Sequence, residues 1–367
     1  MADAAVAVNL LWCVPGDVGG SEEYLVRQLL GLAEADPSVQ PHLYVVAGFL
    51  DAHPQLRELF ASTVAPFDGT SRARRIAGEI TWFRRHTAAA ALRHHGGGTA
   101  PLGSTNPYVL TIHDLQFRTF PDHFSRGKRT YLAAMTGRSV RHARIVAVPS
   151  EYVRSRVIES CSSDPSRVMV VPHGFEPELL FDITGEDELR ERYALGDRPV
   201  ILYPAVTHPH KNHQFLIDLL ATSWSDAEQL LVLIGGTGSA EGVVRSAADP
   251  RIRRLGRVPA ADRNGLLRMA DAMVFPSLYE GFGAPLIEAM ALGCPVIASD
   301  ATCIPAILEG AGLALPLTKE AWADALDRVD RDRGAMIAAG LSRSLDFTAH
   351  ASGKALAAVY AAALEQS

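Results

Sequence analysis

AMVFPSLYEGFGAPLIEAMALGCPVIASD, which runs from Ala272 to Asp300, decides the fold class of this sequence. It begins with the apolar run Ala272–Phe275, passes through a glycine-containing loop at 276–283, and ends in a second apolar run, Pro295–Ala298. Between the runs, Pro285 suits the first turn of a helix, and apolar residues recur after it at helical spacing. A strand, a loop, a helix and a strand in this order form the repeating unit of a parallel sheet, so we predict an α/β protein.

The loop of this unit carries the residue types of a ligand site. Glycines at the start of a helix allow close approach of the backbone, and the free N–H groups there attract phosphate or sugar hydroxyls. Glu280 lies in the loop and Glu288 lies eight residues later in the helix, so both carboxylates can face one crevice. Carboxylates repel phosphate but accept hydrogen bonds from sugar hydroxyls, which favours a nucleotide sugar. The alternative is that Glu280 is a solvated loop acid and Glu288 only favours its helix N-terminus.

The segment PSLYEGFGAPLIEAMALGCPVIAS resembles the signature of the retaining glycosyltransferases of family 4. These enzymes have the GT-B fold, in which two Rossmann-like domains face each other across a cleft. The signature contains two glutamates separated by seven residues, here Glu280 and Glu288. The resemblance implies that Glu280, a predicted catalytic residue, holds the donor sugar together with Gly281, Phe282 and Gly283, and that Glu288 binds the nucleotide ribose.

Length and composition agree with a two-domain enzyme. The chain has 367 residues, too many for one ordinary core, and 48% of them are hydrophobic. The formal net charge of −6 argues against general nucleic-acid binding. The four cysteines show no paired spacing, so we predict neither a disulfide scaffold nor a metal site. The first residues lack a basic leader, and no apolar run is long enough to span a bilayer, so we expect a cytoplasmic protein.

The length of the chain predicts two domains, and the resemblance implies their boundaries and what each of them binds. Residues 1–174 are expected to form an N-terminal, acceptor-side Rossmann-like domain, and 175–198 an interdomain linker region. Residues 199–345 are expected to form the C-terminal nucleotide-sugar-binding domain. The resemblance implies that a last helix, 346–367, crosses back to the N-terminal domain.

Gly19 and Gly20 are predicted donor-binding residues of the N-terminal domain. They lie between the first predicted strand, 6–12, and a helix at 22–33, at the carboxyl end of a sheet where α/β proteins bind ligands. A tight turn alone would also require glycine there. The resemblance implies a glycine-rich loop beside the donor diphosphate and the acceptor.

His113 and Asp114 form a polar pair at the end of the predicted strand Tyr108–Ile112. Such pairs are good site candidates, although an ordinary strand end is the alternative. Many family 4 enzymes have a His-Asp-Leu segment at this point. The resemblance implies that His113, the second predicted catalytic residue, orients the transferred sugar, and that Asp114 holds the loop or the histidine.

A basic segment, 71–93, is predicted to be an amphipathic helix with apolar side chains on one side. Such a helix can contact an anionic membrane or an anionic, lipid-linked acceptor, and an ordinary solvated face is the alternative. His94 and His95 follow it, and adjacent histidines point in different directions, so joint metal ligation is not expected. The glycines at 96–98 are candidates for lining the acceptor side.

Lys211 precedes a predicted helix in PAVTHPHKNHQFLIDLL, and a lysine near a helix N-terminus suits phosphate. A solvated surface lysine is the alternative, but the resemblance implies a diphosphate-binding lysine. Val206 departs from the family pattern, which usually has an arginine there, so one expected cation is missing. His208, His210 or an arginine from elsewhere can replace it. Ala306, where many relatives have glutamate, is a second departure.

The resemblance implies two further loops near the nucleotide. Three glycines at 235–238 follow the strand Leu230–Ile234 and match half of a dinucleotide fingerprint, which is weak evidence alone. Val258 and Pro259 form a turn after another strand, and the resemblance implies that the backbone of Val258 contacts the base.

The sequence thus predicts a retaining hexosyltransferase that needs neither a metal nor a cofactor besides its nucleotide-sugar co-substrate. GDP-mannose is the predicted donor because HDLQFRTFPDHFS and YPAVTHPHKNH resemble bacterial mannosyltransferase-type members. The expected acceptor is a hydroxyl of a glycan, a lipid-linked molecule or a small molecule. No nucleic-acid partner is expected, and 71–93 is the candidate for peripheral contact with the inner membrane face. The alternatives are a sugar-nucleotide epimerase or hydrolase, or a non-catalytic sugar-nucleotide-binding subunit, which the missing arginine favours.

Overall fold

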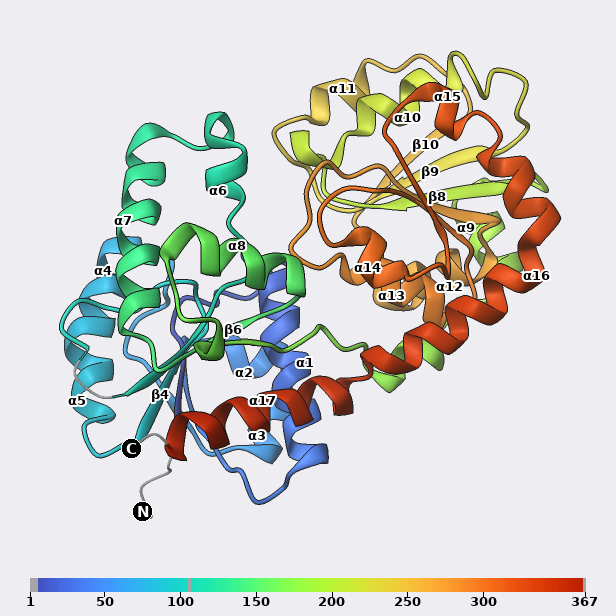
Figure 1. The fold of residues 1–367 in the computed structure, drawn as a ribbon. Helices are drawn as coiled ribbons and strands as arrows, with labels where there is room; N and C mark the ends of the chain where they lie inside the picture. The colour runs from blue at the N-terminus through green and yellow to red at the C-terminus, as the bar shows by residue number, and fades with distance from the viewer. Residues whose placement is uncertain (1–5, 105–106, 366–367) are drawn as a thin grey trace. The chain divides into compact units, whose positions relative to one another are not determined.

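The computed structural model describes residues 6–104 and 107–365. The chain divides into two compact units. The first combines the chain up to Gly174 with the segment that begins at Thr348, and the second is Phe175–Phe347. Each unit is built on one parallel sheet (Figure 1), which confirms the predicted α/β fold class. The outer ends of the predicted domain ranges, 1–5 and 366–367, lie outside the described residues.

Seven parallel strands form the first sheet among the described residues, in the order β3-β2-β1-β4-β5-β6-β7. The strands are β1 (Val6–Leu10), β2 (His42–Val45), β3 (Ser62–Val64), β4 (Leu92–His95), β5 (Tyr108–Thr111), β6 (Ile145–Val148) and β7 (Val168–Val170). Strand order reverses between β1 and β4, and parallel sheets bind ligands outside the carboxyl ends of the strands at such a point.

The helices of the first unit pack against this sheet and bury its apolar side chains. They are α1 (Gly20–Ala35), α2 (Phe49–Ala52), α3 (Pro54–Leu59), α4 (Arg72–Gly78), α5 (Arg84–His86), α6 (Gln116–Thr119), α7 (Arg126–His142), α8 (Glu151–Cys161) and α17 (Ala349–Glu365). A π-helix, η1 (Glu79–Phe83), joins α4 to α5, and short 3-10 turns are η2 (Pro121–His123) and η3 (Pro165–Arg167). The Ser150 hydroxyl caps α8, because it accepts a hydrogen bond from the N–H of Val153.

The helix α17 packs along α1 within the first unit (Figure 1). Two glycines allow the backbones to approach closely: a Cβ atom added to Gly31 would lie 1.8 Å from the carbonyl oxygen of Ala349, and one added to Gly353 would lie 2.0 Å from the carbonyl carbon of Gly31. The Tyr360 hydroxyl also lies 2.8 Å from Nδ1 of His94 in β4. The last helix is therefore part of the core of the first unit.

The second unit repeats the same strand order. Its six described strands are all parallel and run in the order β10-β9-β8-β11-β12-β13. They are β8 (Val200–Pro204), β9 (Leu230–Ile234), β10 (Ile252–Gly256), β11 (Ala272–Phe275), β12 (Val296–Ser299) and β13 (Leu313–Leu315). Here the order reverses between β8 and β11, so the loops after these two strands meet at the switch point.

The helices of the second unit are α9 (Glu186–Arg192), α10 (His213–Leu220), α11 (Glu241–Arg245), α12 (Ala260–Met269), α13 (Ala284–Ala291), α14 (Ile304–Leu308), α15 (Lys319–Trp322) and α16 (Ala325–Ser344). The 3-10 turns are η4 (Pro177–Leu180), η5 (Pro209–Lys211) and η6 (Leu345–Phe347). The segment expected to be a linker, 175–198, contains η4 and α9. Leu189 of α9 is fully buried, and Arg192 forms an ion pair with Asp262 of α12, so this segment packs within the second unit.

One predicted helix differs from the structure. The basic segment 71–93 is helical only as far as His86, and Arg93 lies in β4, where it is 2% exposed and donates to the Thr87 hydroxyl and carbonyl. The prediction was wrong because three of the four residues of β4 are polar, so β4 lacks the apolar run that is typical of a buried strand. In the second unit, α15 is one short turn, whereas α16 is one long helix that continues through Gly334.

Candidate functional site

An ion pair connects the two predicted donor-binding loops of the second unit. Nζ of Lys211 lies 2.6 Å from Oε1 of Glu280, and the two side chains are 17% and 11% exposed. The ammonium also lies 5.5 Å from the centre of the Phe275 ring. Lys211 follows β8 and Glu280 follows β11, so the pair lies at the switch point of the sheet.

Lys211 is held by its backbone. It ends the 3-10 turn η5, and the next residue, Asn212, has a left-handed conformation with φ of 56°. The carbonyl of Lys211 accepts a 2.6 Å hydrogen bond from the hydroxyl of Tyr203, which is fully buried in β8. Because the main chain is fixed there, the ammonium group is presented at a defined point beside α10.

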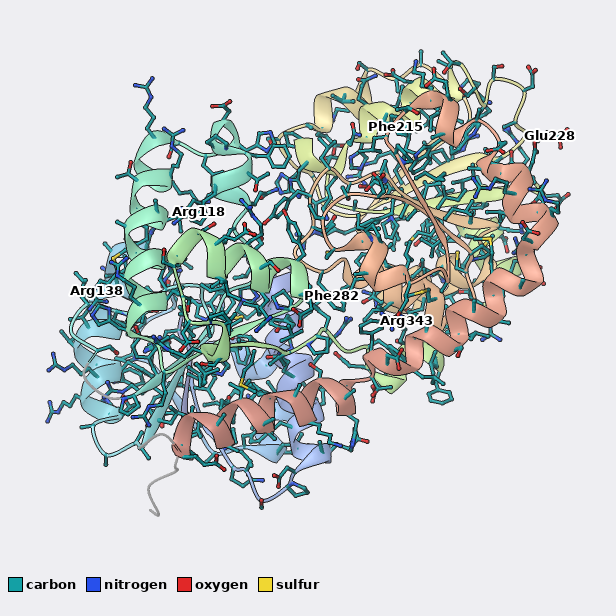
Figure 2. All side chains as sticks on the ribbon, viewed as in Figure 1. Arg118, Arg138, Phe215, Glu228, Phe282 and Arg343 are labelled. Atoms are coloured by element: carbon teal, nitrogen blue, oxygen red, sulfur yellow. The ribbon has the colours of Figure 1, made fainter. Side chains whose placement is uncertain are left out.

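The loop that carries Glu280 is fixed from the chain after β12. The N–H of Glu280 donates to the Thr302 hydroxyl at 3.1 Å, and the thiol of Cys303 lies 3.2 Å from the carbonyl oxygen of Phe282. The Phe282 ring, labelled in Figure 2, is buried and packs edge-on against Phe347 at 5.6 Å. Burial raises the pKa of the Cys303 thiol to about 12, so it is not a reactive thiolate.

The helix α13 begins directly after this loop. Gly283 precedes it with φ of 91°, a conformation that L side chains rarely adopt, and Pro285 occupies the first turn as predicted. Glu288 lies one turn into α13 and is only 4% exposed. The alternative that Glu288 only favours its helix N-terminus stays open, whereas the 11% exposure of the Glu280 side chain argues against a solvated loop acid at Glu280. Gly281 lies between Glu280 and Phe282 in the same loop.

The loop after β8 packs tightly against the glycine loop at 235–238. A Cβ atom added to Gly235 would lie 2.6 Å from the Ala205 carbonyl oxygen, and one added to Gly238 would lie 2.5 Å from that of Thr207. Thr207 is fully buried and its hydroxyl donates to Glu241 at 2.5 Å. Val206, the departure from the family pattern, lies within this packed region.

Val258 lies in the turn between β10 and α12, as predicted. Arg254 on β10 forms an ion pair with Glu241 at 3.3 Å and donates to the carbonyl oxygens of Gly235 and Gly236. Arg254, Glu241 and Thr302 were missed from the sequence, because nothing in their local pattern separates them from ordinary surface residues.

The first unit brings a second set of predicted residues to the carboxyl end of its own sheet. Gly19, with φ of 68°, ends the loop after β1, and Gly20 begins α1. Both are exposed, and a Cβ atom at either would meet no atom within 4 Å, so neither glycine is needed for packing. Glu22 holds this loop: it accepts a 3.0 Å hydrogen bond from the N–H of Gly16 and contacts His53 at 2.7 Å.

His113 lies directly after β5, near the same edge. Its Nε2 lies 2.7 Å from the carbonyl oxygen of Gly96, so this nitrogen carries the proton and Nδ1 is the acceptor. Burial lowers the pKa of His113 to about 4, which makes the ring neutral at pH 7. It packs against Trp12 and Tyr24 at 5.8 and 5.4 Å. A neutral imidazole can orient a hydroxyl but cannot serve as a ready proton donor.

The neighbouring predictions have different outcomes. Asp114 accepts from the N–H of Gln116 at 2.8 Å and so holds the start of α6. His94 and His95 are buried on opposite faces of β4: His94 contacts Tyr360 and Thr111, and Nδ1 of His95 accepts from the Asn9 amide at 3.2 Å. No group of three or more His, Cys, Asp or Glu side chains within residues 6–104 and 107–365 is arranged to hold a metal ion.

The basic segment keeps an exposed charged face despite the corrected helix boundary. Arg72 and Arg74 on α4 and Arg84 and Arg85 on α5 are exposed, while Phe83 is buried in the core. Across the part of the chain that the structure describes, every helix is too short or too polar to cross a bilayer. Peripheral membrane contact through this segment stays a prediction.

The comparisons with known proteins agree with this architecture. Residues 18–179 match the family model described as Glycosyltransferase Family 4, and residues 198–332 match the model described as Glycosyl transferases group 1. The chain is 28% identical to O-antigen chain mannosyltransferase B of Escherichia coli over 213 residues, which are 56% of each protein. It is 27% identical to O-antigen chain mannosyltransferase RfbU of Salmonella typhimurium over 61% of each. The chain therefore spans less than two thirds of these curated relatives.

The fold is also found in solved structures. Sucrose-phosphate synthase from Thermosynechococcus elongatus superimposes with a TM-score of 0.76, at 20% identity, over 99% of each chain. This similarity shows the fold, and the two family models together cover most of both units. The chain has the GT-B fold and is built from the family 4 and group 1 domains of glycosyltransferases.

Proposed function

We propose that this protein transfers a hexose from a nucleoside diphosphate sugar to an acceptor hydroxyl, with retention at the anomeric carbon. The observation that carries the proposal is the Lys211–Glu280 pair at the switch point of the second sheet, beside the N-terminus of α13. It combines a cation suited to phosphate with a carboxylate suited to sugar hydroxyls.

The reaction requires stabilisation of charge. As the glycosidic bond breaks, negative charge grows on the departing diphosphate and positive charge on the sugar ring. In the resting protein, Glu280 holds the ammonium of Lys211 in place. When the donor binds, the ammonium faces phosphate oxygens and Glu280 accepts hydrogen bonds from the sugar. The N–H groups after Gly283 add positive potential, and the Gly19–Gly20 loop of the first unit is proposed to do the same.

The acceptor oxygen is proposed to attack the anomeric carbon on the face from which the diphosphate departs. The bond to the diphosphate breaks as the bond to the acceptor forms, and the proton of the acceptor hydroxyl passes to the departing diphosphate. His113 then has an orienting role, because its ring is neutral and Nε2 already donates to Gly96. Glu280 and Glu288 are assigned to binding, so the two-carboxylate scheme of glycoside hydrolases is not proposed. No step is assigned to a metal ion or cofactor.

GDP-mannose is the proposed donor. The sequence resemblance supports it, and two of the curated relatives are named as mannosyltransferases. The acceptor is proposed to be a glycan, a lipid-linked molecule or a small molecule, and the place of action is proposed to be the cytoplasm or the inner membrane face.

The test is a panel of GDP-, UDP- and dTDP-sugars, scored for binding by calorimetry and for slow release of nucleoside diphosphate. We expect selective binding of one donor, slow release, and a released sugar that keeps the donor's anomeric configuration in proton NMR spectra. Lys211→Ala and Glu280→Ala should reduce release about 100-fold or more while remaining folded. Lys319→Ala and Glu320→Ala on α15 are matched controls in the same unit.

Each rival gives a different result. Rapid consumption of donor without any acceptor, or conversion to another sugar nucleotide, would identify a hydrolase or an epimerase. Tight binding with no turnover would identify a non-catalytic binding subunit. Absence of binding across the whole panel would contradict the proposed donor site.

A further inference from the structure

Most of the cationic side chains considered at the carboxyl edge of the second sheet form ion pairs with acidic side chains. Lys211 forms its 2.6 Å ion pair with Glu280. Arg254 forms an ion pair with Glu241 at 3.3 Å, and its guanidinium also donates to two glycine carbonyls. A nucleoside diphosphate brings at least two further negative charges, so these two pairs leave an anionic ligand incompletely neutralised.

Arg257 also lies at this edge, and it differs from Lys211 and Arg254 in its exposure and its pairing. It directly follows β10, next to Gly256, whose φ is 76°. Its side chain is exposed, and within residues 6–104 and 107–365 its guanidinium has neither a hydrogen bond nor an ion pair. The charge of Arg257 is therefore available to a ligand.

The guanidinium of Arg257 lies directly over the glycine loop. A Cβ atom added to Gly236 would lie 3.1 Å from Nε of Arg257 and 3.4 Å from Nη2. Because Gly236 has no side chain, the guanidinium can approach the backbone closely, and a larger residue would displace it.

The platform beneath Arg257 is fixed. The N–H of Gly235 donates to the Gly256 carbonyl at 2.8 Å, and the N–H of Thr207 donates to the Gly236 carbonyl at 3.3 Å. The N–H of Gly238 donates to the Thr207 hydroxyl at 2.7 Å. These bonds tie the ends of β8, β9 and β10 together, so Arg257 is presented on the same rigid edge that carries Lys211.

We propose that Arg257 is a donor-binding residue whose guanidinium contacts the phosphate oxygens of the nucleoside diphosphate, and that it supplies the cation absent at Val206. A guanidinium presents a planar fork of N–H groups that matches phosphate oxygens, and it stays charged at any physiological pH. This inference rests on the proposed function, and it names a residue of the same site.

The test compares three variants by calorimetry: Arg257→Ala, Arg257→Lys, and Arg245→Ala as the control. Arg245 is an arginine of α11 in the same unit, with a side chain that is 75% exposed. The probes are the nucleoside diphosphate of the donor that the panel identifies and the corresponding nucleoside, each at low and at high salt.

We expect Arg257→Ala to weaken diphosphate binding about tenfold or more at low salt, with a smaller loss at high salt because salt screens the contact. Nucleoside binding should be unchanged, Arg257→Lys should lie between wild type and Arg257→Ala, and Arg245→Ala should match wild type. Equal weakening of nucleoside and diphosphate, or no weakening of either, would overturn the inference while leaving the proposed function standing. A wild-type protein that binds no nucleoside diphosphate would overturn both.

Discussion

Replacing Gly31 with alanine should loosen the helix α17 from the first unit. The added Cβ atom would lie 1.8 Å from the carbonyl oxygen of Ala349, whereas ordinary contact begins at 3.4 Å, so the overlap is 3.4 − 1.8 = 1.6 Å. A backbone carbonyl cannot rotate away as a side chain can, so α17 must shift. Overpacking of this kind costs about 1–3 kcal/mol and sometimes more, while alanine returns about 1 kcal/mol of helix propensity.

The loss should exceed that gain because a shifted α17 also exposes apolar side chains. Leu356, Val359 and Tyr360 are each at most 1% exposed, and full burial of such side chains contributes about 1.5–3 kcal/mol apiece. Partial loss of these contacts, added to the overlap, predicts a net destabilisation of about 3 kcal/mol. For a unit of this size that lowers the melting temperature by about 6–12 °C.

Urea and thermal denaturation followed by circular dichroism would measure the change. Gly334→Ala is the matched control: Gly334 lies inside α16, and a Cβ atom there would meet no atom within 4 Å. It should stabilise the protein by about 0.5–1 kcal/mol. If Gly31→Ala proves insoluble, protease sensitivity of α17 in Gly353→Ala, whose Cβ atom would lie 2.0 Å from the carbonyl carbon of Gly31, serves instead. A Gly31→Ala protein as stable as Gly334→Ala would refute the reasoning.

Two further predictions concern the first unit. Burial lowers the pKa of His94 and of His95 to about 3. The unfolded chain therefore takes up protons on these two rings at a higher pH than the folded chain does, so the free energy of unfolding falls as pH drops below about 6.5. Between pH 7.5 and pH 4.5 each ring should lower it by about 3 kcal/mol. Urea titrations at both pH values should show a smaller loss for His95→Asn, and an unchanged pH dependence would contradict this account. Glu22→Ala should cost about 0.5–1.5 kcal/mol because it removes the hydrogen bond to the N–H of Gly16, whereas Glu23→Ala, at 51% exposure, should cost under about 0.5 kcal/mol. Equal losses would show that Glu22 does not hold the loop.

Most strands of the two sheets could be predicted from the sequence because they are apolar runs. β6, β9 and β11 begin and end where those runs do. β4 could not be predicted, because Arg93 and the two histidines read as polar, and their partners come from remote parts of the chain: His94 contacts Tyr360, 266 residues away. A pattern confined to one stretch of sequence cannot show that a polar side chain will be satisfied inside a core.

The candidate site also contains residues that could be predicted from the sequence and a residue that could not. Lys211 and the Glu280–Glu288 segment were recognisable from their loops, and the structure brings Lys211 and Glu280 together. Their assigned roles stay predictions. Arg257 could not be identified as a candidate from the sequence. It became one only because the nearby cations form ion pairs with acidic side chains, and this pairing is visible only in the folded chain.

The packing of α17 in the first unit has a consequence for the order of synthesis. The ribosome makes Phe175–Phe347 before it makes α17, so α1 lacks the helix that covers it while the second unit is being translated. Nascent chains generally fold domain by domain from the N-terminus, but here the earlier unit must wait for the later one to be translated. During that interval the apolar face of α1 is open to chaperones.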